Sequence, residues 1–155
     1  MLERIEEMVA AHGHAVVGVF ADEERGLPAL NYTVGLAERG WPELVLTGVD
    51  GMSARSILNA TVDWLKERGA PPVAEETFGE GIIGGTFQAR FRPLSENEVE
   101  SNLFIAIQRE TRQGREQPTA MQVVYQDAEG RWPEDDGYSC RMALLLAQGD
   151  EETRQ

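Results

Sequence analysis

Three strand-like segments follow one another before the second helix can begin, and this order limits the folds open to the chain. Residues 14–21 form an apolar run. Residues 30–36 and 43–47 are rich in β-branched, aliphatic and aromatic side chains and are bounded by glycine and proline. A regular βαβ fold places a helix between successive parallel strands, so three strands in a row argue against it. The sequence therefore predicts an α+β domain with a mainly antiparallel sheet.

Amphipathic spacing predicts about three helices, packed on one face of the sheet. The first covers residues 2–11, and Gly13 ends it. The second covers residues 53–68 with Ser53 as its N-cap. A third runs from residue 95 to Gly114, because Ser95 and Glu98 have the spacing of a capping box.

The remaining segments predict two more strands. From Gly85 the pattern alternates strictly, with Phe87, Ala89 and Phe91 on one face, as in a half-exposed strand. Residues 119–126 return to strand. Residues 69–81 are expected to form a loop, and residues 139–147 fit a strand and a helix equally well.

The chain has 155 residues, of which 41% are hydrophobic and 26% are charged, as in a soluble globular protein. We expect one domain over residues 1–148 and a disordered polar tail over residues 149–155. The net charge of -13 repels phosphate backbones, so direct nucleic-acid binding is disfavoured. An acidic surface suits a basic partner, mimicry of a nucleic acid, or simply solubility.

The chain has one cysteine, Cys140, which excludes an internal disulfide framework and a cysteine-rich zinc site. The N-terminus carries acids where a signal peptide carries a basic region and an apolar run. No apolar stretch approaches the roughly 20 residues that span a bilayer. These features predict a cytoplasmic protein without a membrane segment.

Three further patterns are weak indicators of chemistry. Residues 79–84 match G-x-G-x-x-G, but no strand precedes them and no helix follows, so we expect no dinucleotide cofactor. His12 and His14 lack an evident third ligand, which favours turn histidines over a metal site. Cys140 follows an acidic run that raises a thiol's pKa, which predicts an inert thiol.

Glu43 is the most interesting carboxylate, because it stands at a strand entrance beside Trp41 and Pro42. A desolvated glutamate has a raised pKa and can act as a general acid or base. The alternative is structural: Glu43 caps a turn or pairs with Arg39. We favour the structural interpretation.

Several short motifs recur in order across residues 12–133, and they resemble the bacterial DUF4262 family. The resemblance implies a compact α+β domain of actinobacterial or phage origin and supplies no established activity. Where the family usually has an aromatic residue, a histidine and a tryptophan, this chain has His14, Trp41 and Tyr125. A catalytic role for the family's histidine would therefore be lost here. The motifs are His12-Gly13-His14-Ala15-Val16-Val17-Gly18-Val19, Tyr32-Thr33-Val34-Gly35-Leu36, Trp41-Pro42-Glu43-Leu44, Gln122-Val123-Val124-Tyr125 and Gly130-Arg131-Trp132-Pro133.

Two hypotheses of function follow. The first is a non-enzymatic binding or regulatory domain that engages a protein partner. The second is a small hydrolase or ligand-binding enzyme with Glu43 as acid–base and Tyr32 or Gln122 orienting the substrate. A weaker third hypothesis, a nucleic-acid mimic, requires the acids of residues 22–24, 75–80 and 134–136 to form one stripe. The predicted binding patch consists of Tyr32, Thr33, Trp41, Glu43, Gln122 and Trp132.

Overall fold

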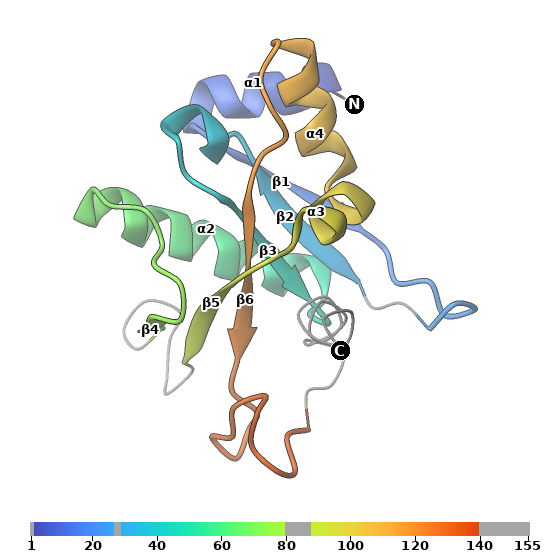
Figure 1. Ribbon diagram of the computed structural model, residues 1–155, viewed down its shortest axis with the longest axis vertical. Coiled ribbons are helices and arrows are strands. Elements are labelled where there is room, and N and C mark those ends of the chain that lie inside the picture. Colours follow the sequence, from blue (N-terminus) through green and yellow to red (C-terminus); the bar gives the residue numbers. More distant parts are fainter. Residues whose placement is uncertain (1, 27–28, 80–87, 140–155) are drawn as a thin grey trace.

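The computed structural model describes residues 2–26, 29–79 and 88–139, which fold around one six-stranded sheet (Figure 1). The spatial order of the strands is β1-β2-β3-β6-β5-β4. β3 and β6 run parallel, and every other neighbouring pair is antiparallel. The predicted α+β class with a mainly antiparallel sheet is confirmed. The strands are β1 (Ala15–Val19), β2 (Leu30–Val34), β3 (Glu43–Thr47), β4 (Thr77–Phe78), β5 (Ala89–Pro93) and β6 (Ala120–Tyr125).

The parallel pair is a feature that strand order alone did not predict. The chain leaves β3 and returns to its side as β6 only after three helices and the two strands β4 and β5. This long crossover is what allows the two strands to run the same way. The short strand β4 lies within residues 69–81, so the prediction of an unbroken loop there was wrong.

Helices cover both faces of the sheet, which corrects the prediction of a single helical face (Figure 1). α2 (Gly51–Arg68) packs Leu58 and Leu65 on one face. α1 (Leu2–His12), α3 (Glu96–Asn102) and α4 (Phe104–Arg112) pack on the other. β2 and β3 are consequently buried throughout. The apolar run Leu44-Val45-Leu46 in β3 was the sequence signal for burial on both faces, because apolar and polar residues alternate in a strand with one solvent-exposed face.

The second helix begins earlier than predicted. Asp50, rather than Ser53, is the N-cap of α2, and its Oδ1 accepts a hydrogen bond from the Ser53 N–H at 3.0 Å. Both residue types cap helices well, so the sequence alone does not separate them. The predicted Ser95 cap is confirmed, since its Oγ accepts from the Glu98 N–H.

The predicted third helix is two helices, α3 and α4, separated at Leu103. Leu103 is fully buried with φ -100° and ψ 52°, outside the helical region. The Ile105 N–H beyond the break donates to the Tyr32 hydroxyl oxygen at 3.0 Å instead of to a helical carbonyl. The cause is therefore a tertiary contact with β2, and no glycine or proline marks it in the sequence.

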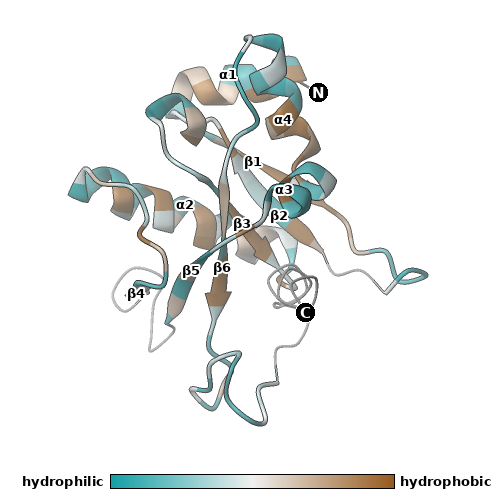
Figure 2. Cartoon of the chain, in the orientation of Figure 1, coloured by the Kyte–Doolittle hydropathy of each residue, from teal (hydrophilic) through white to brown (hydrophobic). Residues whose placement is uncertain are grey.

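Several sequence predictions fall on residues outside the described ranges. They concern Cys140, the tail over residues 149–155, nearly all of the G-x-G-x-x-G segment and of residues 139–147, and the start of the alternating strand. No helix in the described ranges is both long and apolar enough to cross a bilayer. Figure 2 shows hydrophobic residues on β3 and at the end of β6, and hydrophobic and hydrophilic residues alternating along α2.

Candidate functional site

Glu43 at the start of β3 is a buried carboxylate that organises the turn after β2. Its side chain is 1% exposed. Oε1 accepts from the Thr33 hydroxyl at 2.8 Å and the Leu36 N–H at 3.2 Å. Oε2 accepts from the Gly35 and Ala37 N–H groups, each at 3.1 Å. These donors open the 3₁₀-helix η1 (Leu36–Arg39), so Glu43 caps a turn, the structural role that we favoured.

Gly35 allows the turn to close around this carboxylate. Its φ of 112° lies in the region that residues with a Cβ avoid. A Cβ there would also meet the Val9 methyl groups at 3.1 Å and the Gly13 carbonyl oxygen at 3.2 Å. Burial raises the pKa of Glu43 to about 7, while the four hydrogen bonds act in the opposite direction.

The other predicted patch residues do not gather around Glu43. Gln122 is buried and donates to the Thr47 hydroxyl, at the far end of β3. The Tyr32 hydroxyl is directed at α4, and Trp132 stacks under the Arg90 guanidinium at 3.8 Å. Trp41 is half-buried beside Arg39. Within the predicted patch, Thr33 and Glu43 are joined by a direct hydrogen bond.

Glu43, Tyr32 and Gln122 are all buried, and none of them lines any of the pockets of about 210 to 430 Å³ that lie elsewhere on the described residues. The acid–base hypothesis gains no support from these pockets.

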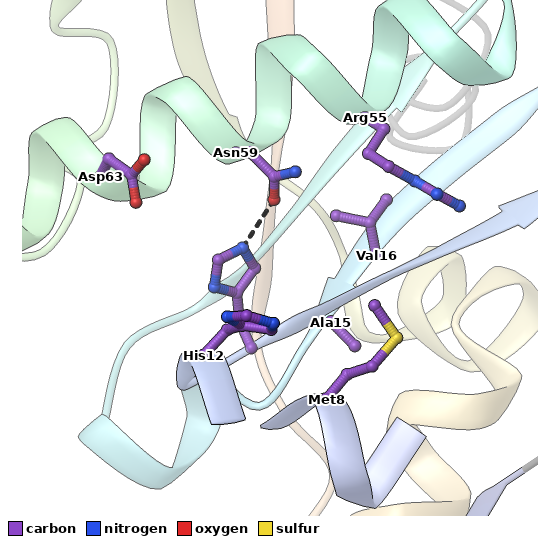
Figure 3. A pocket seen from close by; sticks show the side chains of 8 residues that line it. Met8, His12, Ala15, Val16, Arg55, Asn59 and Asp63 are labelled. Carbon is purple, nitrogen blue, oxygen red and sulfur yellow. Dashed lines mark hydrogen bonds between the residues drawn. The ribbon is translucent and has the colours of Figure 1, made fainter. Parts of the chain in front are cut away.

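A pocket of about 370 Å³ lies where α1, β1 and α2 meet (Figure 3). α2 contributes Arg55, Asn59 and Asp63, which succeed one another along its exposed side at intervals of four residues. Met8 and His12 come from α1, and His14 precedes β1. Ala15 and Val16 supply the apolar wall from β1.

His14 is the chemically informative residue of this pocket. It is 7% exposed, and its Nε2 lies 2.8 Å from Asn59 Oδ1. Because that oxygen only accepts, Nε2 carries the proton and Nδ1 is a bare acceptor in the neutral ring. Burial lowers the pKa of His14, which favours this neutral form. Nδ1 is buried and has no hydrogen-bond partner among the described residues.

The two histidines predicted as a possible metal pair differ in their surroundings. His12 ends α1 and is exposed, whereas His14 is buried. Among residues 2–26, 29–79 and 88–139, no group of three or more His, Cys, Asp or Glu side chains could hold a metal.

A second pocket, of about 430 Å³, lies at the other end of β1 and has an apolar rim. Phe20 is 96% exposed and Met52 is 84% exposed, and Val19 beside them is half-exposed. We call these three residues the Phe20 patch. Figure 2 shows the hydrophobic segment leaving β1 before the chain turns hydrophilic at the acidic loop over residues 22–26.

Neither pocket was predicted from the sequence. Phe20 was expected to lie inside a strand, whereas β1 ends at Val19 and leaves Phe20 in solvent. The four-residue spacing of Arg55, Asn59 and Asp63 was a usable signal, since it puts three polar side chains on one face of a helix. The pairing of that face with His14 is tertiary and has no sequence signal.

Comparison with protein-family models matches residues 8–139 to the family described as "Domain of unknown function (DUF4262)". A search of curated proteins and a search of solved structures each found no match.

Proposed function

Because the chain belongs to the DUF4262 family, whose function is unknown, its activity has to be argued from its own surface, and we propose that it is a non-enzymatic protein-interaction domain. The Phe20 patch is the interaction surface, and the partner is a basic protein that buries Phe20. The single observation that carries the proposal is the near-complete exposure of Phe20 and Met52 side by side on one pocket.

An aromatic side chain contributes to stability only when it is buried, and Phe20 contributes almost nothing to the fold it belongs to. Single exposed apolar residues are common, but a cluster around a pocket is typical of an interaction site. Aromatic residues and methionine are the types enriched at the centres of such sites. The Phe20 patch has both.

The negative charge of the chain favours a basic partner. The chain carries a net charge of -13, and the acids of residues 22–24 and Asp50 flank the patch in sequence. A second copy of the chain would bring the same charge to the interface and be repelled. A basic partner is attracted, and its association is faster at low ionic strength.

The test compares partners captured from a bacterial lysate by the immobilised full chain and by two variants. Phe20→Asp puts a charge at the centre of the patch. Phe104→Asp is the matched control, because Phe104 is 69% exposed on α4, outside the patch. Each captured protein is identified by mass spectrometry, purified, and its affinity for the three chains measured by calorimetry.

We expect a basic protein that binds the wild type and Phe104→Asp alike, and that binds Phe20→Asp at least about thirtyfold more weakly, as for a central interface residue. Equal affinity for all three chains would overturn the proposal. So would finding that the only partner dependent on Phe20 is a second copy of this chain.

A further inference from the structure

Two pockets follow one another along β1 on the side of α2, and Arg55 lines both of them. We call the two pockets together the β1 groove. Ala15 and Val16 line the first and Gly18 and Val19 the second, while the lining of α2 passes from Asp63 down to Met52. β1 and α2 therefore run in opposite directions along the groove.

The dimensions of the groove match an extended chain. The five residues of β1 span about 16 Å at roughly 3.3 Å per residue. The stretch of α2 from Gly51 to Asp63 spans about 18 Å at 1.5 Å per residue. A segment of about five extended residues would fill this length.

β1 is the outermost strand on its side of the sheet, and within the described ranges it pairs with β2 alone. Alternate N–H and C=O groups of an outermost strand face away from its neighbour, where an added strand can pair with them. Gly18 has no side chain at the middle of the groove, and the Asn31 side chain of β2 lies over it. A Cβ at this position would lie 2.8 Å from Asn31 Oδ1, so a larger residue would require the Asn31 side chain to shift.

The two ends of the groove offer different recognition. The Phe20 patch is apolar, whereas the other end holds the buried His14 acceptor with no partner in the described part of the chain. Nδ1 is closed to solvent in this structure, so an N–H or O–H group of a ligand would pair with it once the side chains around it move. The Asp63 carboxylate of the same pocket forms no ion pair with a described residue.

We propose that the partner inserts an extended peptide segment into this groove as an added strand beside β1, with an apolar side chain on the Phe20 patch and an N–H or O–H donor at His14. The inference rests on the proposed function and specifies its mode. A main chain in extended form supplies the hydrogen bonds, and the two ends of the groove select the side chains.

The probe is a phage-displayed library of random heptapeptides, selected on the full chain and resynthesised as free peptides. Each selected peptide is then made in a series with one backbone amide N-methylated at a time. In an added strand, alternate amides point to β1 and the others to solvent. We expect methylation at every second position to weaken binding at least about tenfold, and methylation between them to have little effect.

His14→Phe keeps a ring of similar size and removes the acceptor nitrogen. We expect it to weaken the selected peptides at least about tenfold, with Phe104→Asp as the unaffected control. The proposed mode is overturned if no peptide is selected, if methylation shows no alternation, or if His14→Phe leaves affinity unchanged. If the basic partner still depends on Phe20 in those cases, the interaction function stands and only the strand-addition mode fails.

Discussion

Glu43 and His14, two of the buried ionisable groups of this domain, are 29 residues apart in sequence but differ in how their polar atoms are satisfied. The Glu43 carboxylate accepts from a hydroxyl and three backbone N–H groups. The His14 ring has one partner, Asn59, and an acceptor nitrogen that no described residue reaches.

The Glu43 carboxylate serves the fold, whereas the His14 ring holds a buried acceptor that the described residues leave unpaired. Buried polar atoms are nearly always paired, because leaving one unpaired costs the full desolvation penalty. Glu43 obeys that rule within the chain. His14 does not, and it lines a pocket, so its missing partner is best supplied from outside. The raised pKa of Glu43 does not by itself distinguish a turn cap from an acid–base residue.

The largest effect is expected for Glu43→Ala. Removing the carboxylate leaves the Thr33 hydroxyl and three N–H groups without their acceptor, and we expect a loss of about 3–5 kcal/mol in the free energy of unfolding. Urea denaturation monitored by tryptophan fluorescence measures it. Thr33→Val, which disturbs the same cluster less, should cost about 1–2 kcal/mol. If Glu43→Ala lowered the free energy of unfolding less than Thr33→Val does, the role of Glu43 as a turn cap would be contradicted.

The pH dependence of stability should be opposite at the two sites, and Glu43 should dominate it. Its pKa of about 7 in the folded state lies above the unfolded value of 4.5, so the folded state binds the proton more tightly. The resulting stabilisation is full below pH 4.5 and is lost as the pH rises through 7. In the wild type, the free energy of unfolding should fall by up to about 3 kcal/mol between pH 5 and pH 8 because of this group. Urea denaturation of Glu43→Gln at the same two pH values should not show this fall. An unchanged pH difference would show that Glu43 is ionised throughout.

For His14 the folded-state pKa is lowered below 6.5, so stabilisation is present above pH 6.5 and is lost as the pH falls through the folded value. The same urea midpoints in His14→Phe should therefore decline less on acidification than in the wild type. Asn59→Leu removes the imidazole's one hydrogen-bond partner while keeping the titrating ring. It should retain a decline at low pH. If His14→Phe and the wild type decline equally, His14 is not held neutral by the fold.

The difference between the sites also explains what the sequence could predict. The turn cap is local, because Glu43 accepts hydrogen bonds from residues ten or fewer positions away. Its position at a strand entrance, with Gly35 and Pro42 nearby in sequence, suggested this role. The groove joins His14 to Asn59 across 45 residues, and no spacing rule reaches that far. The same holds for the break at Leu103, which Tyr32 imposes from 73 positions away. Strand order and helix faces were predictable from periodicity, but long-range pairing was not.

His14→Phe should leave the stability of the free protein nearly unchanged, in contrast to Glu43→Ala. The substitution forfeits the hydrogen bond to Asn59, and it also removes a buried acceptor that has no described partner. These two terms oppose each other, so we expect a change below about 1 kcal/mol in urea at pH 7. A loss as large as that for Glu43→Ala would mean that Nδ1 is satisfied within the folded chain, and the groove would lose its polar recognition element.

The smallest effect on stability is expected for Phe20→Ser. A side chain that is 96% exposed buries almost no apolar surface, so its loss should change the free energy of unfolding by less than about 0.5 kcal/mol. Leu58→Ala, in the core on α2, should lower the free energy of unfolding by about 3 kcal/mol and serves as the positive control. A substantial loss for Phe20→Ser would mean that Phe20 packs against the chain itself. With no such loss, an effect of Phe20→Ser on partner binding can be assigned to the interface rather than to misfolding.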